Sequence, residues 1–393
     1  MSDRLALDGG EPVRRVPFPP WPQATPAAHA ALREVLDSGH WWQSGGGRAE
    51  DFEGWLERYH GVVGAVAVTN GTHALELAFR TLGVGPGDEV LVPAITFIST
   101  ASAVSLVGAR PVPVDVDRAT LCLDVADLEG KVSPSSRAVV PVHLAGQPAD
   151  MPAVMAIAAD AGLTVVEDAA QALGAEWEGQ RVGTFGDLTI FSFQASKLLS
   201  SGEGGALLVR SAANVLERTH LLANCGRARG DMTFDHRLVG SNFRMTEFQA
   251  ALLLTQADQY EQLWRERDAA ARALSYALDA DGLAEPVGLA GGVTRMAWYA
   301  FPIRVPAGSS NVDFAAALTA EGVPAKTLFP PFYATAAYAG ALPRPPGCPQ
   351  AEAASREFVW LHHSVLLDGE RGVHDVARAV RKVARLGVAA LQS

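Results

Sequence analysis

The sequence predicts an α/β protein built on a mostly parallel central sheet. From residue 65 onward, short apolar runs alternate with stretches of helical periodicity. The runs are apolar at nearly every position, which is typical of strands covered by helices on both faces. Glycines and polar residues directly follow several runs, and ligands in such sheets bind at the carboxyl ends of strands. We therefore expect a site along that edge.

Composition narrows the possible functions. The 393 residues are 48% hydrophobic and 19% charged, so the chain can bury a sizeable core and is not disordered. A net charge of −11 argues against nucleic acid or an anionic membrane as the main partner. Three widely spaced cysteines without metal-site spacing favour a reducing, cytoplasmic location. We expect neither a signal peptide nor a membrane span.

The N-terminal part precedes the regular alternation. Residues 1–24 are rich in proline and are predicted to form an arm that lies extended over the body. Helices are expected over 27–38 and 49–59. Between them, Trp41 and Trp42 stand beside three glycines. This segment either lines a pocket or interface or forms an ordinary packing corner.

The alternating region contains the predicted sheet. A helix over 72–83 places several apolar residues at helical spacing on one buried face. A helical stretch over 246–282 follows the strands, and Pro286 with 288–292 then breaks the pattern. We therefore predict a large domain over 25–282 and a smaller α+β domain over 283–393. The predicted strands are 65–69, 89–93, 111–116, 138–143, 163–168, 188–193 and 206–209.

Lys197 stands between two apolar runs, beside a glycine-rich turn. An ammonium group in this position has few solvated directions and is costly unless it is paired or used chemically. A desolvated lysine suits Schiff-base chemistry with a carbonyl or with pyridoxal 5′-phosphate (PLP). The alternative is a lysine that reaches the surface at a strand end.

Two upstream motifs complete a PLP site. Asp168 ends an apolar run and could pair with a protonated pyridine nitrogen, or with an arginine. Gly71 and Thr72 stand at a strand-to-helix turn, where backbone N–H groups and the helix dipole favour phosphate, although a plain capped turn has the same residues. An amine, an acid and a phosphate cup are the three parts that PLP requires.

Other conspicuous residues have structural explanations. Phe97 could stack on a ring or belong to the core. His143 at a strand end is interpreted as a satisfied core histidine. His362 and His363 lack the carboxylate and cysteine neighbours of a metal site. The sequence contains no Walker loop, GxSxG elbow or GxGxxG fingerprint.

These residues resemble the PLP-dependent aminotransferases of the DegT–StrS group, which act on sugars or in secondary metabolism. The resemblance covers nearly the whole chain. It implies the aspartate-aminotransferase (type I) fold and a homodimer with active sites at the interface. The motifs that carry it lie at 69–75, 92–97, 141–151, 167–171, 191–205 and 240–245.

The resemblance also implies residue roles. Lys197 would bind the PLP aldehyde and Asp168 the pyridine nitrogen. Lys197 also separates the chain from the family branch that uses histidine there for deoxygenation. The other contacts carried over are Gln171 near the ring hydroxyl, Phe97 on the ring face, Gly71, Thr72 and Ser192 at the phosphate, and Asn242 reaching the phosphate from the neighbouring subunit.

Within the family, residues 40–42, 191–194 and 359–363 are most similar to 3-amino-5-hydroxybenzoate synthases and then to glutamine-dependent scyllo-inosose aminotransferases. Ala195-Ser196 departs from the first group. The similarity implies amino transfer from L-glutamine or L-glutamate to a cyclic polyhydroxy ketone (ketocyclitol, keto-sugar or shikimate-like) in antibiotic biosynthesis. Two alternatives stay open, a PLP-dependent dehydratase/aromatase of the 3-amino-5-hydroxybenzoate synthase type and a non-enzymatic regulator or helper subunit.

Overall fold

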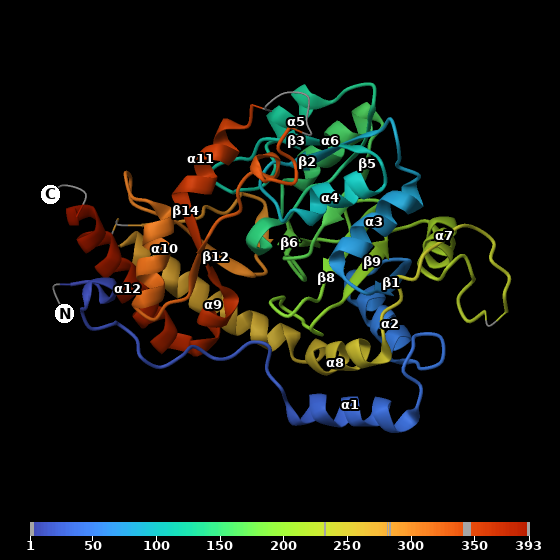
Figure 1. Cartoon of the computed structure of the whole chain (residues 1–393), viewed down its shortest axis with the longest axis horizontal. Coiled ribbons are helices and arrows are strands. Elements are labelled where there is room, and N and C mark those ends of the chain that lie inside the picture. Colours follow the sequence, from blue (N-terminus) through green and yellow to red (C-terminus); the bar gives the residue numbers. More distant parts are fainter. Residues whose placement is uncertain (1–3, 232, 281, 283, 341–346, 391–393) are drawn as a thin grey trace.

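The computed structural model describes residues 4–231, 233–280, 282, 284–340 and 347–390. A seven-stranded sheet occupies the middle of the molecule, and a four-stranded sheet lies toward the left in Figure 1. A small three-stranded sheet contains β6 (Glu176–Trp177), β7 (Gln180–Arg181) and β11 (Val293–Arg295). The mixed α/β architecture predicted from the sequence is confirmed.

The central sheet is mostly parallel, as predicted. Its order is β1-β9-β8-β5-β4-β2-β3, and only β9 runs antiparallel to its neighbours β1 and β8. Every residue of β1, β2 and β9 is buried, which explains their continuous hydrophobicity. The strands are β1 (Gly64–Val68), β2 (Glu89–Pro93), β3 (Arg110–Val114), β4 (Ser136–Val139), β5 (Thr164–Asp168), β8 (Leu188–Ser192) and β9 (Gly205–Val209).

Helices cover this sheet, and some of them begin directly after a strand. The predicted apolar face of α3 is buried at Leu75, Ala78 and Phe79. The helical stretch expected over 246–282 is two helices, which separate at Asp258 and Gln259. The helices are α1 (Pro26–Ser38), α2 (Arg48–His60), α3 (Gly71–Leu82), α4 (Ser99–Leu106), α5 (Val125–Lys131), α6 (Met151–Ala161), α7 (Ala213–Ala223), α8 (Glu247–Ala257) and α9 (Tyr260–Asp279).

The second sheet is antiparallel, in the order β10-β12-β14-β13. Its elements are β10 (Glu285–Pro286), β12 (Ala300–Arg304), α10 (Asn311–Ala320), β13 (Ala325–Thr327), α11 (Pro349–Glu357), β14 (Phe358–His362), the 3₁₀ helix η4 (His363–Asp368) and α12 (Gly369–Ala390). Helix α9 packs against α12. The division at 282 and 283 stays a prediction, since residue 283 lies outside the described residues.

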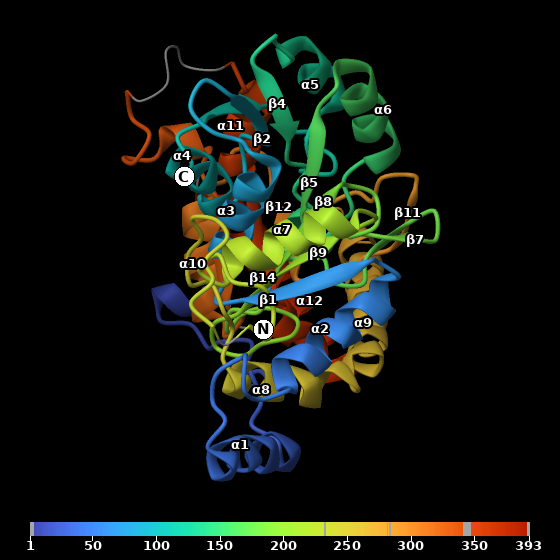
Figure 2. The ribbon, with the colours of Figure 1, turned by 90° about the vertical axis from the view of Figure 1, so that its right-hand side faces the viewer.

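The described part of the arm contacts both the region of the second sheet and the region of the central sheet. Near its start, the backbone N–H groups of Ala6 and Val13 donate to the buried carboxylate of Glu321, at 2.8 and 3.0 Å. Further along, the Trp21 indole Nε1 donates to the carbonyl of Lys197 at 2.8 Å. Helix α1 follows the arm and projects beside α8, away from both sheets (Figure 2).

The two tryptophans after α1 lie against the segment before α8. Trp42 forms a bridge with Thr246, and the Trp41 carbonyl accepts from the N–H of Glu247. Both indoles stay partly exposed, at 50% and 38%. The Glu247 carboxylate accepts from the N–H groups at the N-terminus of α2. These hydrogen bonds fix the glycine turn between Trp42 and α2.

Candidate active site

Lys197 lies in a loop between β8 and β9. The paired strands continue into the loop, because Phe193 N donates to Gly204 O and Ala195 N to Gly202 O, at 2.8 and 2.9 Å. Burial lowers the pKa of the Lys197 amine to about 8, and the nearby Asp168 carboxylate opposes this shift. The lysine therefore does not simply reach the surface. A substantial fraction of the amine is therefore neutral just above neutral pH, which an unshifted lysine would not offer.

Asp168 lies at the carboxyl end of β5 and is 6% exposed. Its carboxylate accepts from the Thr100 hydroxyl at 2.8 Å and from Ala170 N at 3.2 Å. Burial raises the pKa of this carboxyl, and these two donors oppose the rise. Among the described residues none forms a salt bridge with Asp168, so the alternative of an arginine partner is not supported. The acid is available to an added cation.

His143 is a core residue, as interpreted from the sequence. Its ring is fully buried, with Nε2 3.2 Å from Glu167 Oε2 and Nδ1 accepting from Ala149 N at 3.0 Å. Both ring nitrogens are therefore occupied. The residue also supports the end of β5, since its backbone N–H donates to the Asp168 carbonyl.

Gly71 and Thr72 begin α3 directly beside the end of β8. A Cβ atom at Gly71 would lie 2.9 Å from the Ser192 Cβ, so only glycine allows this approach. The Thr72 hydroxyl lies 2.7 Å from the Ser99 hydroxyl, at the start of α4. Two helix N-termini and two hydroxyls therefore gather where a phosphate cup was predicted.

The other predicted residues are placed differently. Gln171 lines one small cavity with Ser192 and Lys197, and its Oε1 accepts from Ala145 N at 2.7 Å. Phe97 is 55% exposed, with its ring centroid 6.0 Å from that of Phe329, so the core alternative for Phe97 is wrong. Asn242 is exposed, and among the described residues its side chain forms no hydrogen bond with the other predicted site residues.

Several residues around Lys197 were missed in the sequence. The Lys197 Nζ lies 4.4 Å from the centroid of the Tyr299 ring, and the Tyr299 hydroxyl is 3.0 Å from the Ser196 hydroxyl. His362 and His363 were considered only as metal ligands, and the described residues contain no cluster suited to a metal ion. Instead, both imidazoles form hydrogen bonds with the Ser196 carbonyl.

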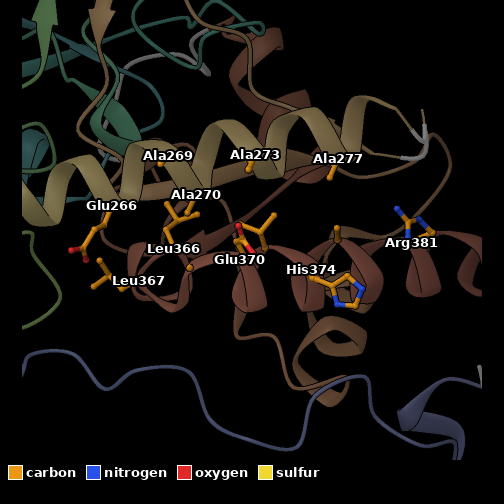
Figure 3. Close-up of a pocket in the computed structure, with 13 residues that line it drawn as sticks. Glu266, Ala269, Ala270, Ala273, Ala277, Leu366, Leu367, Glu370, His374 and Arg381 are labelled. Carbon is orange, nitrogen blue, oxygen red and sulfur yellow. The ribbon is translucent and has the colours of Figure 1, made fainter.

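A separate groove lies between α9 and α12 (Figure 3). Its floor is apolar, and charged side chains including Glu266, Glu370 and Arg381 stand at its rim. None of the predicted site residues lines it. The candidate active site is therefore the region around Lys197 and Asp168.

Residues 22–381 match the family described as the DegT/DnrJ/EryC1/StrS aminotransferase family. The chain belongs to this aminotransferase family. It is therefore an enzyme, and PLP is the cofactor of the family. No helix of the described residues is long and apolar enough to cross a membrane.

Relatives within this family are similar over nearly their whole length. A 3-amino-5-hydroxybenzoate synthase from Amycolatopsis mediterranei (strain S699) is 40% identical over 94% of this chain and 98% of its own. An L-glutamine:2-deoxy-scyllo-inosose aminotransferase from Streptomyces fradiae is 37% identical, over 98% and 99%.

Solved structures agree with this assignment. A crystal structure of 3-amino-5-hydroxybenzoic acid synthase superposes with a TM-score of 0.89, at 40% identity over 94% of this chain and 99% of that one. A protein from Streptococcus pneumoniae described as a sugar aminotransferase, in its PLP form, gives a TM-score of 0.88 at 26% identity over 95% and 99%.

The residues of this aminotransferase fit PLP. Asp168 is a buried acid without an ion-pair partner among the described residues, which suits a protonated ring nitrogen. A side chain at Gly71 would fill the space between α3 and Ser192. The lowered pKa of the Lys197 amine suits an aldehyde, because only the neutral form attacks it.

Proposed function

We propose that this aminotransferase moves an amino group from L-glutamine or L-glutamate to a cyclic polyhydroxy ketone, a ketocyclitol, keto-sugar or shikimate-like ring, in antibiotic biosynthesis. The observation that carries the substrate class is the similarity to several L-glutamine:2-deoxy-scyllo-inosose aminotransferases, at 37–38% identity over almost the full chain. The family assignment and the Lys197 environment support the chemistry.

Bound PLP supplies an aldehyde that takes up amines and a ring that accepts an electron pair. Lys197 would bind that aldehyde, and its freed Nζ would take the proton from the Cα of the amino donor, which a pKa of about 8 allows near neutral pH. Asp168 would hold a proton on the ring nitrogen, and Thr100 would keep Asp168 ionised by donating to it.

The remaining predicted contacts belong to the same proposal. Gln171 would lie near the ring hydroxyl and Phe97 on the ring face. The phosphate would bind at Gly71, Thr72 and Ser192, whose close approach supports this role. Such contacts orient the cofactor and leave the reacting bond to Lys197.

A homodimer with shared active sites is part of the proposal, with Asn242 of the partner subunit reaching the phosphate. The exposure of Asn242 supports it. So do Phe234 and Val239 in the preceding loop, which are 91% and 93% exposed, because large apolar side chains this exposed would be buried favourably at an interface. Free Cys122, Cys225 and Cys348 support a cytoplasmic location. We further propose the division into an arm (1–24), a large domain (25–282) and a small domain (283–393).

A second candidate function is supported by the 40% identity to a 3-amino-5-hydroxybenzoate synthase. In that case the enzyme would dehydrate and aromatise an amino-dehydroshikimate-like ring, with Lys197 again as the base. Product analysis separates the two functions. An amine formed from an added cyclic ketone supports transamination, and an aromatic acid without an amino donor supports the lyase.

A half-reaction screen tests the proposed transamination. The visible absorbance of bound PLP should disappear with L-glutamine or L-glutamate and return when a cyclic polyhydroxy ketone is added. Lys197→Ala should lower turnover by at least about 10²–10⁴-fold, because it removes both the amine and the base. Turnover retained in Lys197→Ala, or no visible absorbance with PLP in the wild type, would contradict the proposal.

A further inference from the structure

Two consecutive carbonyl groups flank the side chain of Lys197, and both accept hydrogen bonds from distant parts of the chain. The Lys197 carbonyl accepts from the indole Nε1 of Trp21 at 2.8 Å. The Ser196 carbonyl lies 3.0 Å from Nε2 of His362 and 3.2 Å from Nε2 of His363. Trp21 belongs to the arm, while the histidines stand at the end of β14 and the start of η4.

The hydrogen bonds fix the protonation of His362. A carbonyl oxygen only accepts, so Nε2 of each histidine must carry the proton. Nδ1 of His362 then accepts from the backbone N–H of Ser364 at 3.3 Å. His362 is therefore neutral in this arrangement, and burial lowers its pKa, which favours the same form.

The three donors also contact one another. The rings of Trp21 and His363 meet edge to face with centroids 4.8 Å apart, and those of His362 and His363 are 4.1 Å apart. His363 is fully buried. The arm and the second sheet thus contribute one set of packed rings beside the Lys197 loop.

We propose that Trp21, His362 and His363 are positioning residues for Lys197. By holding the carbonyls before and after its side chain, they fix the backbone from which the ε-amine extends. The Tyr299 ring then limits the positions that the amine can take. This inference rests on the proposed role of Lys197 as the reactive amine, and such alignment is worth about 10²-fold in rate per ångström of displacement.

The first test compares two indoles. Trp21→Phe removes the donor to Lys197 but keeps an aromatic ring beside His363. Trp264→Phe is the matched control, because Trp264 Nε1 donates to the Met296 carbonyl at the same distance of 2.8 Å and not to the Lys197 loop. Both variants lose one hydrogen bond, so a merely structural role predicts equal effects.

In the cofactor-free chain, Trp21→Phe should speed amide hydrogen exchange of peptides covering 194–204, and Trp264→Phe should not. In the holoenzyme, Trp21→Phe should lower kcat on the order of 10-fold with little change in KM, because alignment rather than binding is lost. Equal exchange rates and equal kcat values in the two variants would overturn the proposal.

The second test is rescue at His362. His362→Leu removes the donor, whereas His362→Gln can place an amide N–H near the original Nε2. We expect His362→Gln to restore slow exchange and most of kcat, with His220→Leu as a control for the loss of a half-buried imidazole elsewhere. Identical behaviour of His362→Gln and His362→Leu would count against a donor role. Absence of wild-type turnover would reject the proposed function, while the exchange data would still decide the positioning role.

Discussion

The candidate site has two parts that are built differently. We call the part around Asp168, Gly71 and Thr72 the cofactor edge, and the residues packed around the Lys197 loop the Lys197 flank. The cofactor edge uses residues at or shortly after the ends of strands of the central sheet, such as Asp168 at the end of β5 and Gly71 at the helix start that follows β1. The Lys197 flank uses Trp21, Tyr299 and His363, which come from the arm and the second sheet. Local sequence positions the side chains of the cofactor edge, whereas tertiary packing positions those of the Lys197 flank.

This difference predicts unequal sensitivity to substitution. In the proposed roles, cofactor-edge residues would contact PLP itself, so their loss should remove electrostatic stabilisation. Residues of the flank act through the position of Lys197, so their loss should reduce alignment only. The following measurements can confirm or contradict that ranking.

The largest effect is expected for Asp168→Asn. The substitution keeps the shape and removes the negative charge that would hold the ring-nitrogen proton, so kcat should fall about 10²–10³-fold. Steady-state kinetics and the absorbance of bound PLP measure it. Asp124→Asn, which keeps a helix-capping side chain on α5, should leave kcat unchanged. Equal kcat values for the two variants would show that the pyridine ring does not bind beside Asp168.

The pH dependence of PLP capture should follow the Lys197 amine. Its pKa is lowered from 10.5 to about 8, and only the neutral amine attacks an aldehyde. The rate should therefore rise about 10-fold per pH unit up to pH 8 and level above it. Asp168→Asn should move the midpoint to lower pH, because the carboxylate favours the ammonium form. Stopped-flow absorbance measures both curves, and a midpoint near 10.5 would contradict the buried environment.

Gly71→Ala should weaken PLP binding by about 10-fold, because the new methyl would lie 2.9 Å from the Ser192 Cβ and overpacking costs roughly 1–3 kcal/mol. Titration of the cofactor-free protein with PLP measures the affinity. Gly130→Ala in α5 is the control, since a Cβ there meets nothing within 4 Å. Unchanged PLP affinity in Gly71→Ala would show that the phosphate does not bind at this turn.

Tyr299→Phe should have the smallest effect. It keeps the ring face near the Lys197 Nζ and removes only the hydroxyl that lies 3.0 Å from the Ser196 hydroxyl. A single such hydrogen bond contributes about 0.5–1.5 kcal/mol, so kcat should fall by no more than about 10-fold. Steady-state kinetics measure it. A loss as large as that of Asp168→Asn would show that the hydroxyl itself takes part in the chemistry.

Local patterns account for what the sequence could predict. The strands were found because burial on both faces makes them continuously apolar, and Asp168, Gly71 and Lys197 stand at their ends. Thr100 was missed, because a threonine at the start of a helix carries no sign that it faces an acid 68 positions away. Trp21 and His363 were missed for the same reason, since their contacts with the lysine loop depend on how the arm and second sheet pack.

The arm is held near both of its ends, first at Glu321 and later at the Lys197 carbonyl. This matters for handling the protein. A protease cut between Val13 and Trp21 would leave the first stretch bound through Glu321, so the nicked molecule would co-purify and look intact under native conditions. Denaturing electrophoresis or intact mass would reveal that the covalent connection between the Glu321 contact and the Trp21 contact had been lost.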